Sequence, residues 1–192
     1  MGRNAHHRKA GGKACLLDAD HRACGWVSIA EAVRLLAAQG VGRLVDVRTV
    51  PRSRHNPQFN RDRLPDDLAR AGIGYVHMPG LGGLRRPRPD SVNLGWRNSG
   101  FRGYADYMQT LEFQSNLDAL GRLAAGLPTA VMCAETVPWR CHRSLIADAL
   151  TVRGIDVHHI ITTDEAQPHR LTATARLCDE RLIYPVVEGR SA

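Results

Sequence analysis

The segment Thr129-Ala-Val-Met-Cys133 has the composition of a strand that is buried on both faces of a sheet. A helix is predicted for Ser144–Arg153, because apolar residues recur there at helical spacing and Gly154 follows as a C-terminal cap. A further strand is predicted for Ile155–Ile160. A strand, a helix and a strand in this order indicate a parallel sheet that is covered by helices.

The same alternation of helices and strands precedes this segment. The first predicted helix begins with a capping box at Ser28 and Glu31 and ends at Gly40. The pattern predicts later strands over Arg43–Val47, Ile73–His77 and, as a short edge strand, Leu182–Val187, and helices over Arg61–Ala71, Tyr104–Met108 and Leu111–Ala125. The polar stretch Pro79–Gly100 is long for a loop, and such loops are usually functional or disordered.

These elements predict one α/β domain over residues 23–192, built in three layers with a small, mainly parallel sheet flanked by helices. Residues 1–22 are predicted to be a basic, poorly ordered N-terminal arm, and no strand is predicted in them. The start of the chain has no apolar segment of the kind found in a secretory signal.

Composition favours an anionic partner. The net charge is +7, and every basic residue except Lys9 and Lys13 is an arginine, whose planar fork binds phosphate and carboxylate. The partner is therefore expected to be an anionic small molecule or nucleic acid. No run of about 18 apolar residues is present, so no membrane span is expected. Five irregularly spaced cysteines without an export signal favour a reduced, cytoplasmic setting.

Polar residues follow three of the predicted strands. Because the carboxyl ends of parallel strands lie at one edge of a sheet and bind ligands there, these residues are expected to form one site. They are Asp46, Arg48, Arg52, Arg54, His55 and Asn56 after the first strand, Gly80–Arg88 after the second, and Glu135, Trp139, Arg140, Cys141, His142 and Arg143 after Thr129–Cys133.

The thiol of Cys133 is the first candidate for chemistry. A strand, a loop and a helix N-terminus form an anion site, where a thiol would have a lowered pKa and could act as a nucleophile. The Cys-x5-Arg motif of cysteine phosphatases fails here, because Trp139 stands where that motif has arginine. Cys133 could instead be a small buried hydrophobe.

Two further interpretations concern the same segment. Cys133, Cys141 and His142 could be metal ligands, completed by Cys24 or His77, although the gap of seven residues between the cysteines is wide. Glu135 could be a general base or could orient arginines, and Arg143 could bind an anion or form an ion pair with Glu135 or Asp46.

The chain resembles the domain-of-unknown-function 488 family over about residues 28–187. The resemblance rests on Leu44-Val-Asp-Val-Arg48, Pro51-Arg-Ser-Arg-His-Asn-Pro57, Leu81-Gly-Gly83, Trp96-Arg-Asn98, Phe101–Met108, Met132-Cys-Ala-Glu135 and Pro138–Ser144. It implies a compact α/β domain with a small parallel sheet and no settled activity. The positions that match the family are Asp46, Arg48, Arg52, Arg54, Asn56, Cys133, Glu135, Trp139, Cys141, His142 and Arg143.

One departure from the family lies near the N-terminus. Members of the family have a Thr-x-Gly-His-Ser-type turn before the first helix, whereas this chain reads Asp20-His-Arg-Ala-Cys-Gly-Trp-Val27. The histidine of the family falls near Cys24, so any role of that histidine would be lost here or supplied by His21 or Cys24.

Three functions follow from these observations. The first is an enzyme acting on a phosphate-bearing or nucleotide-like substrate, with Glu135, His142 and Cys133 as catalytic residues and Asp46, Arg48, Arg52, Arg54, Asn56, Trp139, Cys141 and Arg143 binding the substrate. The alternatives are a non-catalytic nucleic-acid-binding module and a Cys/His metal-binding or redox protein. The sequence specifies neither a cofactor nor the oligomeric state.

Overall fold

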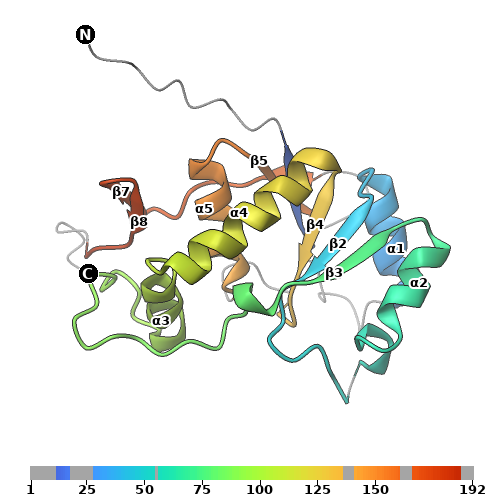
Figure 1. Ribbon diagram of the computed structural model, residues 1–192, viewed down its shortest axis with the longest axis horizontal. Coiled ribbons are helices and arrows are strands. Elements are labelled where there is room, and N and C mark those ends of the chain that lie inside the picture. Colours follow the sequence, from blue (N-terminus) through green and yellow to red (C-terminus); the bar gives the residue numbers. More distant parts are fainter. Residues whose placement is uncertain (1–11, 18–27, 55, 136–140, 161–165, 187–192) are drawn as a thin grey trace, which may run out of the picture.

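The computed structural model describes residues 12–17, 28–54, 56–135, 141–160 and 166–186. A six-stranded sheet with the order β3-β2-β4-β1-β5-β6 forms the centre of the molecule (Figure 1). Its strands are β1 (Lys13–Leu17), β2 (Arg43–Asp46), β3 (Gly74–His77), β4 (Thr129–Met132), β5 (Asp156–Ile160) and β6 (Ala166–Pro168). All neighbours in this sheet pair in parallel except β5 and β6, which confirms the predicted mainly parallel α/β fold.

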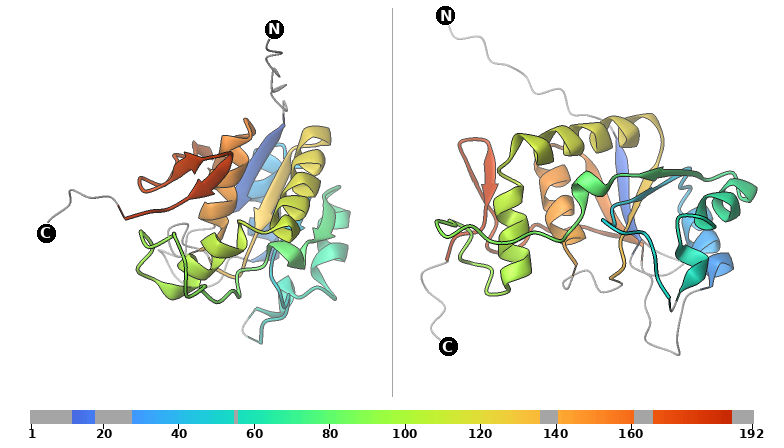
Figure 2. Two further views of the ribbon diagram at one scale, coloured as in Figure 1. Left: turned by 60° about the vertical axis from the view of Figure 1, so that its left-hand side comes forward. Right: turned by 60° about the horizontal axis from the view of Figure 1, so that its bottom comes forward.

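Helices cover both faces of the sheet (Figure 2). They are α1 (Ile29–Ala38), α2 (Leu64–Arg70), α3 (Ser99–Tyr107), α4 (Leu111–Gly126) and α5 (Arg143–Val152), with short 3-10 turns at Pro57–Phe59 and Pro79–Leu81. The predicted capping box is confirmed in part, since the Ser28 side chain accepts a hydrogen bond from the Glu31 N–H. The helix predicted for Tyr104–Met108 begins earlier, at Ser99, because Asn98 caps its N-terminus.

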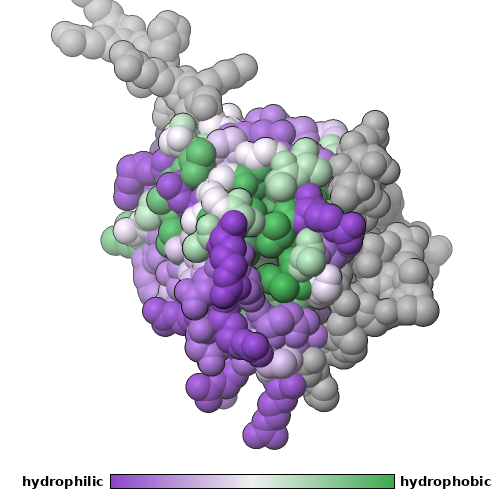
Figure 3. Space-filling view, turned by 90° about the vertical axis from the view of Figure 1, so that its right-hand side faces the viewer, coloured by the Kyte–Doolittle hydropathy of each residue, from purple (hydrophilic) through white to green (hydrophobic). Residues whose placement is uncertain are grey.

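The alternation of side chains along the strands explains these layers. Ala14 and Leu16 of β1 pack in a core with α4 and α5, whereas Cys15 packs in the second core, with α1 and α2. Hydrophobic residues also gather in the middle of the molecular face at the α1, α2 and β3 side, with hydrophilic residues to the left of them and below them in the view (Figure 3). No helix in the described part of the chain is long and apolar enough to cross a bilayer.

The prediction that residues 1–22 contain no strand is wrong for Lys13–Leu17. This segment is β1, which lies between β4 and β5, with Leu16 opposite Val131 on one side and His159 on the other. Ala14, Cys15 and Leu16 are fully buried. Four apolar residues are too few to give a periodic signal, and burial on both faces removes the alternation that identifies a strand. Residues 1–11 and 18–27 lie outside the described residues, so the rest of the arm stays a prediction.

The buried carboxylate of Asp106 in α3 accepts hydrogen bonds from several residues of the long segment Pro79–Gly100. Asp106 accepts hydrogen bonds from the Arg88 N–H (2.8 Å), the Ser91 hydroxyl (2.6 Å) and the Asn93 amide (2.8 Å). Asn93 in turn accepts a bond from the N–H of Tyr184, which joins the segment to the C-terminal part of the chain. A long loop can stay ordered when a buried carboxylate accepts hydrogen bonds from polar groups of the loop that would otherwise be unpaired.

The predicted edge strand Leu182–Val187 is not part of the main sheet. Residues Arg181–Ile183 form β8, which pairs with β7 (Arg176–Cys178) in a separate antiparallel hairpin. Its turn residues Asp179 and Glu180 have φ values of 47° and 64°. The edge strands of the main sheet are β3 and the short strand β6, and β6 ends in proline, which offers no further donor there.

Candidate functional site at the start of helix α5

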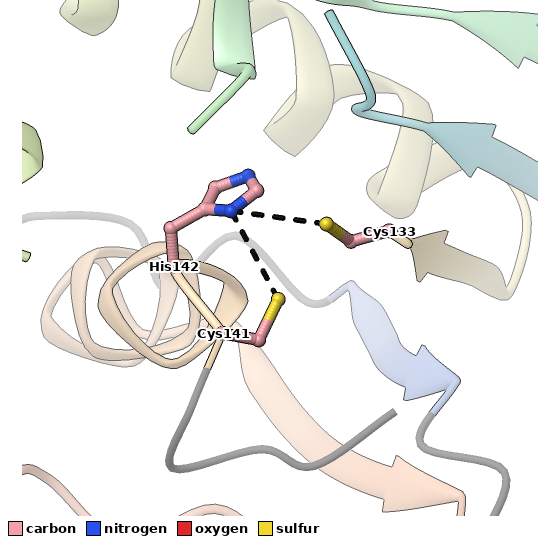
Figure 4. Close-up of side chains that lie close together, drawn as sticks. All are labelled: Cys133, Cys141 and His142. Atoms are coloured by element: carbon pink, nitrogen blue, oxygen red, sulfur yellow. Dashed lines mark hydrogen bonds between the residues drawn. The ribbon is translucent and has the colours of Figure 1, made fainter. Parts of the chain in front are cut away.

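Two cysteines and a histidine meet where β4 ends and α5 begins. Cys133 directly follows the last residue of β4, and Cys141 and His142 directly precede the first residue of α5. Both sulfurs point toward the His142 ring, whose Nδ1 lies 3.8 Å from Sγ of Cys133 and 3.9 Å from Sγ of Cys141 (Figure 4). The three potential ligand atoms all lie within 4.8 Å of one another. The fold thus brings together in space two cysteines that seven residues separate in the sequence.

The His142 ring is held by the loop that follows β3 and by α3. A Cβ added to Gly83 would lie 2.4 Å from Nδ1 of His142, so only glycine allows the loop to come this close. The ring of Tyr104 also packs against the imidazole, with ring centroids 4.8 Å apart. Nε2 of His142 is buried without a hydrogen-bond partner in the described part of the chain. Nδ1 is therefore the nitrogen of His142 that faces the sulfurs of Cys133 and Cys141.

The pKa values of the Cys133 and Cys141 thiols are shifted in opposite directions. The hydrogen bond from Cys133, together with His142 and Arg143, lowers the pKa of Cys141 to about 3 against the effect of burial. The same hydrogen bond to Cys141 and the burial of the group raise the pKa of Cys133 far above its ordinary value. Cys141 is thus the thiolate and Cys133 the protonated thiol that donates to it, the reverse of the lowered pKa predicted for Cys133.

Arg143 supports the charge on Cys141. It is fully buried, and its Nε donates to Sγ of Cys141 at 3.2 Å. A second guanidinium nitrogen of Arg143 donates to the backbone carbonyl of Glu135, and Glu135 itself is exposed. Arg143 therefore joins the thiolate to the loop that leaves β4, and its bond to Glu135 runs through the backbone.

Asp46 and Arg48 lie on the opposite face of the sheet. Asp46 is fully buried and accepts bonds from Nε (2.9 Å) and a terminal nitrogen (2.6 Å) of Arg48, and from the Tyr75 hydroxyl (2.9 Å). Burial and the nearby Asp46 charge raise the pKa of Tyr75, which keeps this donor protonated. Val45 and Val47 pack toward α4 and α5, as Cys133 does, so Asp46 between them points toward α1 and α2. The His77 side chain points to this same face of the sheet, and its Nε2 lies 2.9 Å from the backbone carbonyl oxygen of Arg48.

A comparison with protein families identifies the fold family. The model of the family described as domain of unknown function DUF488 matches residues 28–150, which include Cys133, Cys141 and His142. The chain belongs to the DUF488 family. The match confirms the predicted resemblance over a shorter range than residues 28–187, and it leaves out β1 and β5. No curated protein and no solved structure matches the chain.

The remaining predicted site residues of this DUF488 protein differ in exposure. Arg52 and Arg54 are exposed, and neither has a carboxylate partner in the described residues. Asn56 is half-buried, with a side-chain oxygen that has no hydrogen-bond partner in this part of the chain. His55 and Trp139 lie outside the described residues.

Sequence reasoning did not predict what holds the His142 ring in this DUF488 protein. Gly83 lies in the segment Gly80–Arg88 that was expected to join the site, but neither Gly83 nor Tyr104 was predicted to contact His142. The Gly80-Leu-Gly-Gly83 run was the available signal, because a glycine that lies beside a strand end often marks a close approach of the backbone.

Proposed function

We propose that Cys133, Cys141 and His142 bind one thiophilic metal ion, and that zinc is the ion whose bonds fit. The main observation in support of this proposal is that two sulfurs and one imidazole nitrogen lie within 4.8 Å of one another. Zinc bonds of about 2.3 Å to sulfur and about 2.0–2.1 Å to nitrogen place these atoms roughly 3.6 Å apart in a tetrahedron. The distances of 3.8 and 3.9 Å from Nδ1 to the sulfurs support this geometry.

Electrostatics also favour a metal site. Metal ions bind thiolates, and the lowered pKa of Cys141 provides one ligand that is already deprotonated. The bond from Arg143 to Sγ of Cys141 is the kind of supporting contact that orients a metal ligand. His77 does not complete the set, because its ring lies against the carbonyl of Arg48 on the other face.

We propose that the site is catalytic. Three protein ligands with a fourth position for water or substrate are typical of catalytic zinc sites, where the metal makes water acidic or polarises a substrate oxygen. In this proposal Glu135 is the general base, since its exposed carboxylate is two residues from Cys133 and its backbone is tied to Arg143. The reaction class is metal-assisted hydrolysis.

The proposed substrate is a phosphate-bearing or nucleotide-like anion. Arg52 and Arg54 support it, because they are exposed without a carboxylate partner in the described residues and follow β2 at the edge of the sheet where β4 also ends. The same arginines and the net charge of +7 also support the alternative of a non-catalytic nucleic-acid-binding module. Under that alternative the protein binds RNA or DNA with a steep salt dependence and hydrolyses neither.

Metal analysis of the purified, untagged protein tests the proposal. After dialysis against zinc and then buffer, we expect about one zinc ion per chain, and less than a tenth of this in Cys141→Ser and in His142→Gln. Cys178→Ser is the matched control, because this cysteine is exposed and remote in sequence from the cluster, and it should keep its zinc. A wild-type protein without stoichiometric zinc, or a His142→Gln variant that keeps it, contradicts the proposal.

The catalytic role needs its own experiment. Zinc-loaded protein is assayed against a panel of phosphomonoesters and nucleotides, and the Glu135→Gln variant against any substrate found. Loss of a general base is expected to lower kcat by about 10²–10⁴-fold with zinc content unchanged. Equal kcat values in both proteins would remove Glu135 from the mechanism.

A further inference from the structure

The sulfurs of Cys133 and Cys141 lie close enough to each other to form a direct bond. They belong to the group of three potential ligand atoms that all lie within 4.8 Å of one another, and both point toward the His142 ring (Figure 4). A disulfide needs about 2.05 Å between its sulfurs, so the two atoms have to approach each other by less than about 3 Å. A change of side-chain rotamer at one or both cysteines supplies a movement of this size.

The backbone on either side of the pair holds the two cysteines in place. Cys133 directly follows β4 and Cys141 lies two residues before the first residue of α5. Both elements are anchored in the core, where Val131 and Leu145 are fully buried. A bond between the sulfurs therefore closes a short loop whose two ends are already fixed, and it requires no rearrangement of the sheet.

The other described cysteines lie elsewhere in the molecule. Cys15 is fully buried and packs in the second core, with α1 and α2, whereas Cys133 packs against the first core. Cys178 is exposed in the hairpin strand β7. Cys133 is partly exposed and Cys141 is buried, so a small oxidant reaches the pair at the Cys133 side.

We propose that Cys133 and Cys141 are a site of reversible oxidation, where a hydroperoxide converts the two thiols into a disulfide and so removes both sulfur ligands of the proposed metal. The formation of the disulfide stands on the sulfur geometry alone. Its effect on the metal rests on the proposed function, since a disulfide sulfur no longer provides the thiolate that zinc binds.

The reaction balances with hydrogen peroxide as the oxidant. One sulfur attacks a peroxide oxygen as its thiolate, so an S–O bond forms, the O–O bond breaks, and the hydroxide that leaves takes up the thiol proton as water. The second sulfur then attacks the sulfenic acid, so the S–S bond forms, the S–O bond breaks, and a second water leaves. Each sulfur loses one electron and the peroxide gains two.

Arg143 favours the return to the reduced state. It is fully buried, and its Nε donates to Sγ of Cys141 at 3.2 Å. This contact is stronger with the reduced cysteine, because a disulfide sulfur is a weak hydrogen-bond acceptor. Stabilising the reduced form makes a disulfide easier to reduce. We therefore expect dithiothreitol to reopen the bond without unfolding the chain.

Metal-free, full-length Cys178→Ser protein tests the disulfide, because it lacks the exposed thiol that would join two chains. The protein is treated with a small molar excess of hydrogen peroxide, and peptide mapping by mass spectrometry identifies the residues that become linked. We expect a Cys133–Cys141 link, the loss of two titratable thiols per chain, and recovery of both with dithiothreitol. Wild type should show the same link, and it should be absent when Cys133→Ser is added. Absence of the link in both parent proteins, or oxidation of the two sulfurs to sulfinic acids without a link, overturns the proposal.

Zinc-loaded protein tests the effect on the metal site. We expect peroxide to release zinc in proportion to the disulfide formed, as measured with a chromogenic chelator, and dithiothreitol to restore zinc binding. Zinc that stays bound to the oxidised chain overturns the proposed effect of the disulfide. A reduced protein that takes up no zinc contradicts the proposed metal site instead, and the experiment on the metal-free chain then decides the disulfide by itself.

Discussion

The charge on Cys141 makes a single sulfur sensitive to pH. Its pKa is lowered to about 3 in the folded chain from an ordinary value of 9.0, so between these limits the unfolded chain binds a proton at Cys141 that the folded chain does not. The free energy of unfolding therefore gains a contribution from Cys141 that is complete above pH 9.0 and is lost as pH falls through about 3. The raised pKa of Cys133 acts in the opposite sense, because above pH 9.0 only the unfolded thiol ionises readily.

Metal-free protein should show this thiolate directly. We expect the ultraviolet absorbance of one thiolate per chain at pH 7, decreasing as pH falls toward about 3, and lost at pH 7 in Cys141→Ser. Cys178→Ser, which removes an exposed thiol, should keep the absorbance. Absence of thiolate absorbance at pH 7 in the metal-free wild type would contradict the assignment of the charge to Cys141.

The roles of individual residues were only partly predictable. The parallel-sheet rule predicted that the segments after β2, β3 and β4 lie at one edge of the sheet, and Gly83 of the second segment does lie against His142 of the third. It did not separate the two faces of that edge. Leu44-Val-Asp-Val47 is apolar on both sides of Asp46, so the sequence offers no sign that Asp46 and Arg48 point away from Cys133. Their predicted substrate-binding role stays a prediction, and their observed contacts are with each other and with Tyr75, Phe59 and His77.

At the scale of elements, the Asp46–Arg48 pair fixes the segment that leaves β2. Arg48 also donates to the carbonyl of Phe59 at 2.7 Å, which joins β2 to the turn at Pro57–Phe59. The pair is almost wholly buried, at 8% exposure for Arg48 and 0% for Asp46. Buried partners have already lost their hydration, so each depends on the other.

Removing the Asp46 carboxylate should destabilise the fold. We expect Asp46→Ala to lower the free energy of unfolding by about 3–5 kcal/mol, because it leaves the Arg48 charge buried and unpaired. The matched control is Asp90→Ala, since Arg88 and Asp90 form the same two-bond pair, with the same spacing, on the surface. Chemical denaturation of both variants measures the difference, and equal stability losses would show that burial is not the cause.

Most elements of the fold were predictable, with clear physical exceptions. Caps and apolar spacing correctly located α1, α4 and α5, because these signals are local. The hairpin of β7 and β8 was not predicted, since its turn uses positive φ values at Asp179 and Glu180 where glycine is the usual signal. The order in Pro79–Gly100 could not be predicted either, because it depends on Asp106, which comes after the segment.

At the scale of the whole molecule, strand β1 connects the two halves of the main sheet. It pairs with β4 on one side and β5 on the other, and its residues belong to both cores. The halves of the sheet on either side of β1 have no other strand pairing between them in the described chain. Stability of the complete domain therefore depends on a few residues near the N-terminus.

A single truncation in β1 tests this dependence. Leu16→Ala should lower the free energy of unfolding by about 2–5 kcal/mol, because the side chain is fully buried and leaves a cavity between the sheet and α4 and α5. Leu177→Ala, in the exposed hairpin strand β7 at 58% exposure, should leave stability unchanged within error. A Leu16→Ala variant as stable as wild type would contradict the central position of β1.

The place of β1 also bears on synthesis of the chain. Strand β1 precedes β2 and β3 in the chain, but its two pairing partners, β4 around Val131 and β5 around His159, are made only after β2 and β3. The nascent chain therefore carries an unpaired apolar strand, and the inner edges of its partners stay open until nearly the whole domain has emerged. Such high contact order slows folding and exposes strand edges to aggregation. We expect slow completion of the native state and a need for chaperones during translation.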